Sequence, residues 1–209
     1  MVLYSTIMVG KLITIEGIDG SGKSTLTSEL KKEFNDVLFT SEPQEDQWLG
    51  SVLRKALSDE DMDDMALFFL FLSEHAQHIE DYIKPAMNNN QNVISDRFID
   101  SRYAYQSFAI QDTVSGDSLP WIKDIQENGW SVIPDKTIIL DVSVDTSLER
   151  IADNEKEVFE KRDKLEQARQ VYLDLAESDS ERYAVVDAEQ AKEDVIKECI
   201  GIINEEFES

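Results

Sequence analysis

Short apolar runs alternate with longer stretches of helical periodicity along the whole chain. One helical stretch follows the first apolar run and extends to about Phe34, and another covers about Asp61 to Met87. This alternation is typical of a parallel sheet covered by helices. The pattern therefore predicts an α/β fold with a doubly wound, five-stranded parallel sheet flanked by helices. The predicted strands are residues 11–16, 37–40, 92–96, 136–142 and 183–187.

The length of 209 residues is sufficient for one domain with its own core. We interpret residues 1–209 as a single domain, in which residues 1–10 form an N-terminal tail. The segment from Asp153 to Leu175 is highly charged and lacks glycine, which predicts a pair of helices. Its first part, about 153–165, is expected to act as a lid. The apolar run from Met65 to Leu72 is too short to cross a bilayer and predicts a buried helix.

The charge and the cysteine content restrict the partners and the compartment. The chain has 44 acidic and 20 basic residues, a formal charge of −24, which disfavours nucleic acid and anionic membranes. This acidity fits an adaptation to high salt and an ordinary acidic cytosolic protein equally well. A single cysteine, Cys199, excludes an intrachain disulfide and is typical of a reducing compartment. Residues 1–7 lack the features of a signal peptide, so we expect a cytoplasmic location.

A phosphate-binding loop is the most informative motif of the chain. Residues 17–24 read Gly-Ile-Asp-Gly-Ser-Gly-Lys-Ser and directly follow an apolar strand-like run. The glycines allow backbone N–H groups to surround an anion at the N-terminus of the next helix. Lys23 would reach the terminal phosphates and Ser24 would bind Mg²⁺. The triphosphate-binding residues predicted here are Gly17, Gly20, Ser21, Gly22, Lys23, Ser24 and Thr25.

The loop alone does not separate a kinase from a GTPase switch or an ATP-driven motor. No Asn-Lys-x-Asp or Thr-Lys-x-Asp sequence, which would read guanine, occurs in the chain. Open parallel sheets bind ligands at the carboxyl ends of their strands. We therefore expect the chemistry to gather at Asp19, Glu42, Asp96 and the lid.

Further motifs follow the strands in a fixed order, and together they resemble the thymidylate kinase family. The resemblance extends from about Lys11 to the last helix, and it implies a P-loop kinase that uses ATP and Mg²⁺ to phosphorylate dTMP. It also implies a homodimer that packs through residues 65–72. The motifs are Thr40-Ser41-Glu42-Pro43, the segment 96–101 with Ala104-Tyr105-Gln106, Leu140-Asp141-Val142, Leu148-Glu149-Arg150, Phe159-Glu160 and Val186-Asp187-Ala188-Glu189-Gln190.

The resemblance assigns roles to residues that surround the acceptor nucleotide. Arg97 and Arg54 would hold the acceptor phosphate, because a guanidinium fork suits two oxygens at once. Asp96 would help to bind Mg²⁺. Asp19 would contact the sugar with Glu160 of the lid, and Tyr105 would crowd the 2′ position. Glu42, Pro43, Ser101 and Gln106 complete the dTMP site.

Two positions in the base site depart from the family pattern. Phe71 resembles the aromatic residue that stacks on thymine, and His75 lies four residues later on the same helix face. The family usually has arginine at the position of His75, and Arg102 stands where small polar residues are usual. We expect His75 to donate to the thymine carbonyl, with Arg102 as the alternative donor or as a solvent-facing residue.

At the donor end, the resemblance places adenine against Ala188 and Gln190. Arg150 is expected to hold the ATP phosphates, and Arg162 is expected to be the mobile lid cation, unless it pairs with Glu160 or Glu166. Two other functions stay open: a kinase of another pyrimidine monophosphate, suggested by His75 and Arg102, or a nucleotide-binding switch without transfer activity.

Overall fold

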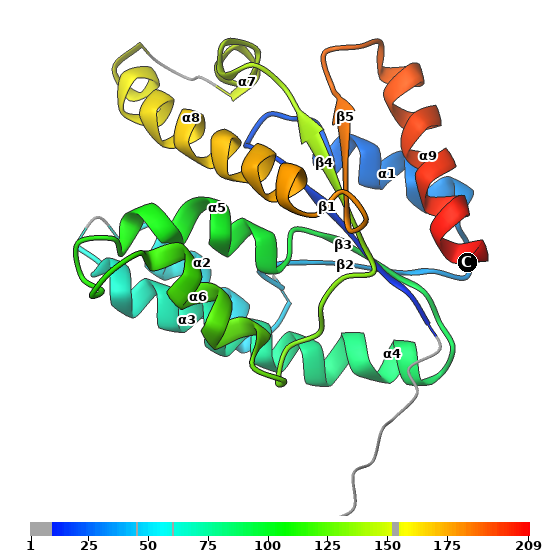
Figure 1. Ribbon diagram of the computed structural model, residues 1–209, viewed down its shortest axis with the longest axis horizontal. Coiled ribbons are helices and arrows are strands. Elements are labelled where there is room, and N and C mark those ends of the chain that lie inside the picture. The colour runs from blue at the N-terminus through cyan, green and yellow to red at the C-terminus, as the bar shows by residue number, and fades with distance from the viewer. Residues whose placement is uncertain (1–9, 45, 60, 152–154) are drawn as a thin grey trace, which may run out of the picture.

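The computed structural model describes residues 10–44, 46–59, 61–151 and 155–209, with the backbone alone for residues 155–161. Its centre is a sheet of five parallel strands in the order β2-β3-β1-β4-β5 (Figure 1). This architecture confirms the predicted fold class. The strands are β1 Leu12–Glu16, β2 Leu38–Ser41, β3 Val93–Asp96, β4 Lys136–Asp141 and β5 Tyr183–Asp187.

The strand order places the ends of three strands together. All of β1 is buried because β3 and β4 pair with it on both sides. Ile15 of β1 is opposite Asp96 of β3, which is in turn opposite Ser41 of β2. From β1 the chain first forms β2 and β3 on one side of the sheet and then β4 and β5 on the other. In such sheets the crevice at this switch point is the usual ligand site.

Helices cover both faces of the sheet. Figure 1 shows α1 and α9 together on one side and α5 and α8 on the other, while α2, α3 and α6 extend beyond α5. The helices are α1 Lys23–Glu33, α2 Trp48–Leu57, α3 Asp64–His78, the π-helix η1 Ile79–Ile83, α4 Lys84–Asn88, α5 Ile99–Ala109, α6 Ser118–Glu127, α7 Val144–Ile151, α8 Glu155–Ser178 and α9 Lys192–Glu208.

Two helical predictions differ from the structure. The helix expected over about 61–87 is divided into α3, η1 and α4, and Pro85 lies in the first turn of α4, where a missing N–H is tolerated. Residues 155–178 form the single long helix α8 instead of a pair, because no glycine or proline interrupts them. Residues 153 and 154 of the expected lid lie outside the described residues.

We expected the apolar run from Met65 to Leu72 to form a buried helix, but the structure shows that most of it is not buried. Within it only Phe68 is fully buried, packed against Trp121 at 5.6 Å between ring centroids, whereas Phe69 is 51% exposed. The run lies on α3 at the periphery of the molecule, so that it presents one face to α5 and another outward (Figure 1). No helix in the described part of the chain is long and apolar enough to span a membrane.

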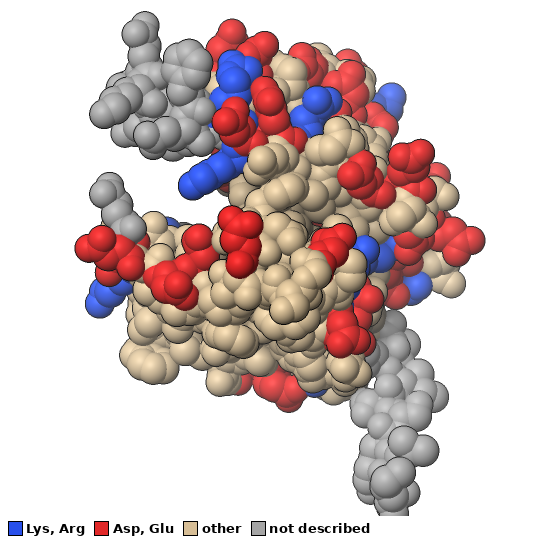
Figure 2. Space-filling model, turned by 60° about the vertical axis from the view of Figure 1, so that its left-hand side comes forward, with Lys and Arg blue, Asp and Glu red and all other residues tan. Residues whose placement is uncertain are grey.

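The surface reflects the excess of acidic residues. Figure 2 shows many Asp and Glu side chains on the upper part and the right-hand side of the visible face, with fewer Lys and Arg side chains among them. Basic residues that gather at one place on such a protein therefore mark a site with a specific demand for positive charge.

Candidate active site

The phosphate loop joins β1 to α1 through backbone conformations that favour glycine. Gly17 has φ 136° and Gly20 has φ 76°. A Cβ atom at Gly17 would lie 2.5 Å from the carbonyl oxygen of Leu140, and one at Gly20 would lie 2.7 Å from that of Ser147. The loop therefore packs against the end of β4 and against α7 so closely that only glycine fits, which fixes the N–H groups around the start of α1.

Lys23 is the first residue of α1 and is buried in this loop. Its Nζ donates to the carbonyl oxygens of Gly17 and Ile18, each at 3.0 Å. Burial, together with the nearby charge of Arg97, lowers the pKa of Lys23 to about 8. A triphosphate in the loop would favour the charged form, so that Lys23 would donate to phosphate oxygens instead.

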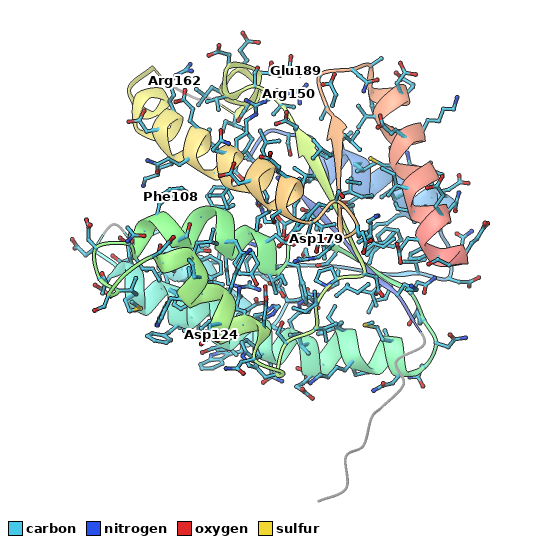
Figure 3. The ribbon with its side chains drawn as sticks, viewed as in Figure 1. Phe108, Asp124, Arg150, Arg162, Asp179 and Glu189 are labelled. Carbon is cyan, nitrogen blue, oxygen red and sulfur yellow. The ribbon has the colours of Figure 1, made fainter. Side chains whose placement is uncertain are left out.

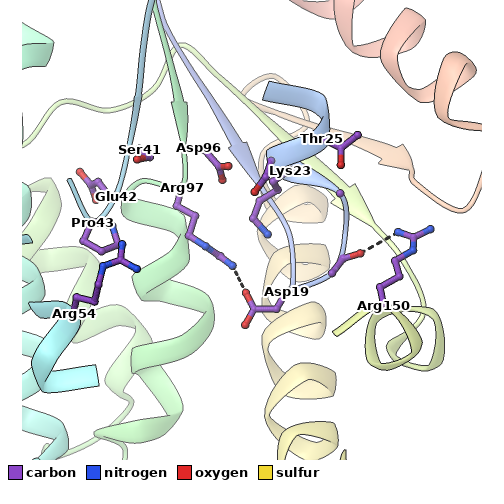
Figure 4. A pocket seen from close by; sticks show the side chains of 13 residues that line it. Asp19, Lys23, Thr25, Ser41, Glu42, Pro43, Arg54, Asp96, Arg97 and Arg150 are labelled. Carbon is purple, nitrogen blue, oxygen red and sulfur yellow. Dashed lines mark hydrogen bonds and ion pairs between the residues drawn. The ribbon is translucent and has the colours of Figure 1, made fainter. Parts of the chain in front are cut away.

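Arg97 follows β3 and faces the phosphate loop. It adopts φ 69°, and its backbone N–H donates to the carbonyl of Ile15 at 3.0 Å. The guanidinium forms an ion pair with Asp19 (Figure 4) and donates to the hydroxyl of Ser101 at 3.1 Å. It also lies over the ring of Tyr105, 5.4 Å from the centroid. The arginine is thus held at the junction of the loop and α5.

Cationic side chains from four elements or loops line one cavity of about 580 Å³ (Figure 4). The carboxylates of Asp19, Glu42 and Asp96 line it as well. Four cations in one cavity of a chain with a net charge of −24 indicate an anionic ligand. These cations are Lys23, Arg54, Arg97 and Arg150.

The same cavity contains oxygen donors that suit Mg²⁺. Both Ser24 and Asp96 line it, and a hydroxyl with a carboxylate is the donor set that Mg²⁺ prefers. Burial raises the pKa of Asp96 above its ordinary value. Among the residues that the structure describes, no three His, Cys, Asp or Glu side chains cluster as a metal site. A metal ion here would therefore take most of its ligands from phosphates and water.

A second cavity of about 240 Å³ shares Asp19, Glu42, Pro43 and Arg97 with the first. Its walls are mostly apolar and aromatic, which suits a flat ring. The structure thus brings together most of the residues expected around the acceptor. The remaining lining residues are Leu57, Phe71, Phe98, Ser101, Arg102, Tyr105 and Gln106.

His75 lies outside this cavity, in contrast to the expectation from its spacing. Its side chain is fully buried, with Nδ1 2.6 Å from Oε1 of Glu42 and Nε2 2.8 Å from the hydroxyl of Ser131. Burial and the charge of Arg102 lower the pKa of His75 to about 4, so the ring is neutral. His75 lies one turn after Phe71 on α3, where its ring contacts Glu42. Both ring nitrogens of His75 therefore have partners within the protein.

Arg102 is buried at the wall of the second cavity, and it does not point to solvent. Its Nη1 donates to Oε2 of Glu42 at 2.7 Å, and its Nε donates to the amide oxygen of Gln126. His78 donates to Oε1 of the same carboxylate at 2.8 Å. Burial would raise the pKa of Glu42, but His75 and Arg102 lower it well below its ordinary value. The ionised Glu42 therefore organises this wall.

A third cavity, of about 260 Å³, lies on the other side of the phosphate loop. It is lined by Arg150, Ala188 and Gln190, together with apolar residues of α1, β4 and α9. Arg150 donates to the carbonyl of Gly20 at 3.0 Å and to that of Ala188 at 3.4 Å. It lines both the first and the third cavity, which suits a ligand whose phosphates and ring occupy both.

Helix α8, whose first part we expected to act as a lid, places Lys164 and not Arg162 beside a hollow. Arg162, labelled near the start of α8 in Figure 3, pairs with Asp145 at 2.6 Å and with Glu166 at 3.6 Å. It is not among the residues that line the three cavities. Lys164 instead shares a further hollow with Asp19 and Tyr105. Side chains two residues apart on a helix face different sides, so Arg162 and Lys164 cannot point to the same place. This spacing could have indicated Lys164 as the alternative cation. The side chain of Glu160 lies outside the described residues.

Glu16, at the end of β1, connects helix α8 to the site. It accepts hydrogen bonds from the backbone N–H of Phe98 at 2.7 Å, from the hydroxyl of Ser101 at 2.7 Å and from that of Tyr172 at 2.8 Å. Burial, with the charge of Asp100, raises its pKa to about 7. The strand, the start of α5 and the helix α8 are thus tied at one carboxyl group, and no sequence motif had indicated Tyr172.

Comparisons with known proteins agree with this geometry. The family model described as thymidylate kinase matches residues 15–199. A probable thymidylate kinase of Methanosarcina barkeri is 42% identical over 204 residues, covering 95% of this chain and 98% of the relative. One of Methanoculleus marisnigri is 45% identical over 195 residues, covering 92% and 93%. The crystal structure of thymidylate kinase from Ehrlichia chaffeensis has a TM-score of 0.69 and 28% identity, covering 93% of this chain and 98% of that one. With its phosphate loop, its clustered cations and these relatives, the chain belongs to the thymidylate kinase family of nucleoside-monophosphate kinases.

Proposed function

We propose that this chain phosphorylates dTMP with ATP and releases dTDP and ADP. The observation that carries this proposal is that Lys23 of the phosphate loop and Arg97 after β3 line one cavity. On one side this cavity meets the hollow at Ala188 and Gln190, and on the other it meets the aromatic cavity at Phe71. A triphosphate and a monophosphate bound at the two ends would meet between Lys23 and Arg97.

The reaction is a direct transfer. An oxygen of the acceptor phosphate attacks the γ-phosphorus, a new P–O bond forms, and the bond to the β,γ-bridging oxygen breaks to release ADP. The acceptor phosphate is already anionic, so no general base is required. The protein supplies position and positive charge: Lys23 and Arg150 act on the triphosphate, and Arg97 acts on the acceptor phosphate with Arg54.

Mg²⁺ would be held by Ser24 and Asp96, whose oxygen atoms suit it. When bound, the ion neutralises charge on the phosphates. Lys23 and Arg97 would retain their own roles beside it, because Lys23 lies in the phosphate loop and Arg97 also lines the acceptor cavity.

The acceptor nucleoside would occupy the aromatic cavity. Phe71 would stack on the base, and Tyr105, which contacts the Arg97 guanidinium, would crowd a 2′-hydroxyl and so favour deoxyribose. Asp19 would contact the sugar with Glu160 of the lid. Arg162 would contribute to transfer only after it leaves Asp145, because that pair now holds it.

The assembly and the location are parts of the same proposal. We propose a homodimer that packs through α3, supported by the 51% exposure of Phe69 in its apolar run. We also propose a cytoplasmic location, where ATP and dTMP are available to a kinase.

A panel of acceptors tests the proposed activity. The chain is incubated with MgATP and, in turn, dTMP, dUMP, dCMP, dAMP and dGMP, and both ADP and the diphosphate product are measured. We expect the highest kcat/KM with dTMP. A higher value with another pyrimidine monophosphate would favour the alternative acceptor, and ATP binding without any diphosphate product would favour a switch module.

A further inference from the structure

Arg97 has a backbone conformation that its surroundings must hold. Its φ of 69° lies in the left-handed region, which residues other than glycine seldom adopt. Directly after it, the backbone N–H of Phe98 donates to Oε1 of Glu16 at 2.7 Å, and that of Ser101 donates to the same oxygen at 3.2 Å. The carboxylate of Glu16 therefore fixes the turn that leads from Arg97 into α5.

The side chain of Arg97 depends on the same carboxylate through one intermediate. Its Nη1 donates to the hydroxyl of Ser101 at 3.1 Å, and that hydroxyl donates to Oε2 of Glu16 at 2.7 Å. A hydroxyl has a single proton, so with this proton on Glu16 the oxygen of Ser101 is an acceptor for Arg97. The direction of the guanidinium therefore follows from how Ser101 and Glu16 are held.

Tyr172 of α8 completes this arrangement. Its side chain is 1% exposed, and its hydroxyl donates to Oε2 of Glu16 at 2.8 Å and lies 3.2 Å from the hydroxyl of Ser101. Burial and the charge of Glu16 raise the pKa of Tyr172 well above its ordinary value, so the hydroxyl keeps the proton that it donates. Two hydroxyl donors on Oε2 and two backbone donors on Oε1 give the carboxylate a single orientation.

Tyr172 is not among the residues that line the three cavities. We propose that it is a positioning residue, which aims the guanidinium of Arg97 at the acceptor phosphate through Glu16 and Ser101. Because Tyr172 belongs to α8, a shift of this helix would change the direction of the guanidinium. The inference rests on the proposed function, in which Arg97 holds the acceptor phosphate, and deepens it.

The test is a double-mutant cycle of Tyr172→Phe and Arg97→Ala. Calorimetry gives the Kd for dTMP, and initial rates give the KM for ATP. Tyr172→Phe alone should raise the Kd for dTMP by about five- to tenfold, since Arg97 loses its aim, and should change the KM for ATP by less than about twofold. In the Arg97→Ala background, Tyr172→Phe should change the Kd by less than about twofold, because the residue through which it acts is gone. Equal effects of Tyr172→Phe in the two backgrounds would overturn the inference.

Tyr183→Phe is the matched control. Tyr183 is a second buried tyrosine, and its hydroxyl donates to Oδ1 of the buried Asp100 at 2.7 Å. It does not line the cavity that contains Lys23 and Arg97. Urea unfolding should show a similar loss of stability in this variant, while its Kd for dTMP stays within about twofold of the wild-type value. A Kd raised as much as in Tyr172→Phe would show that lost stability causes the effect, and would overturn the inference.

Two further outcomes are distinguishable. If Tyr172→Phe does not fold, Ser101→Ala interrupts the same path, and additive effects of Ser101→Ala and Arg97→Ala on the Kd would overturn the inference. A wild type that binds dTMP but forms no dTDP would overturn the proposed function, while the cycle in Kd still decides the role of Tyr172. If another monophosphate binds better than dTMP, the cycle is measured with that acceptor, because Arg97 would hold the phosphate and not the base.

Discussion

His75 and Glu42 form a buried hydrogen bond of 2.6 Å between Nδ1 and Oε1. The bond connects α3 to the segment after β2, and the hydroxyl of Ser131 lies 2.8 Å from the other ring nitrogen. Both nitrogens of a neutral imidazole are thus satisfied inside the protein. His75 therefore stabilises the wall of the acceptor site, and it has no free nitrogen for a ligand.

His75→Ala should lower the free energy of unfolding by about 2–4 kcal/mol, because it opens a cavity and removes partners of Glu42 and Ser131. Urea unfolding measures this loss, and the KM for dTMP should rise by less than about threefold, because His75 does not line the aromatic cavity. A His75→Ala variant with wild-type stability and a KM for dTMP raised about tenfold would contradict this role. It would show that His75 contacts the base of dTMP.

Arg97→Ala should weaken the binding of dTMP much more than the binding of ATP. The guanidinium faces the acceptor end, and loss of a charge-assisted contact costs about tenfold or more in KM. Initial rates with each substrate varied in turn separate the two effects. Arg169→Ala is the control, since Arg169 pairs with Asp141 at 2.6 Å and does not line the cavity that contains Lys23 and Arg97. Equal losses for both substrates would refute the acceptor role.

Glu74→Gln should stabilise the protein at high pH. Burial and the charge of Glu42 raise the pKa of Glu74 to about 7, and its Oε1 accepts from the backbone N–H of Gln44 at 2.7 Å. Above its ordinary pKa the unfolded chain releases the proton that the native state keeps, so wild-type stability falls as pH rises from about 4.5 to about 7.

Glutamine resembles the protonated acid, so the gain from Glu74→Gln should reach about 2–3 kcal/mol at pH ~8 and nearly vanish at pH ~4.5. Urea unfolding at the two pH values checks it. A gain that is independent of pH would show that Glu74 does not titrate in this range.

The strands could be predicted from sequence because each is a short apolar run in a parallel sheet. Residues 183–187 coincide with β5, and Lys136–Asp141 falls one residue short of the predicted strand. The boundaries of the helices could be predicted less well from the sequence. Nothing in the apolar pattern singled out the π-helix η1, whose existence depends on how α3 and α4 pack.

The site could be predicted where chemistry follows a strand directly. Lys23 and Arg97 have places fixed by the ends of β1 and β3, which are neighbours in the sheet. His75 could not be placed in this way, because its partner Ser131 is 56 residues away. The same holds for Arg102, whose partner Gln126 belongs to α6, a helix that the apolar pattern had not indicated.

The net charge of −24 makes a prediction about salt. If the acidity is an adaptation to high salt, the thermal midpoint should rise by several degrees between about 0.1 M and about 2 M KCl, because repulsion is screened. Sulfate is unsuitable, since it strengthens burial generally and binds to phosphate loops. A midpoint that does not change with KCl would favour an ordinary acidic protein.

The central claim is that Lys23 drives phosphoryl transfer from ATP to dTMP, and product formation in the wild type and in Lys23→Ala tests it most directly. The wild type should form one dTDP for each ADP. A folded Lys23→Ala variant should lose about 100-fold or more in turnover, because the charge between the β- and γ-phosphates is no longer neutralised. Near-wild-type turnover in that variant, or ADP formed without dTDP, would contradict the account.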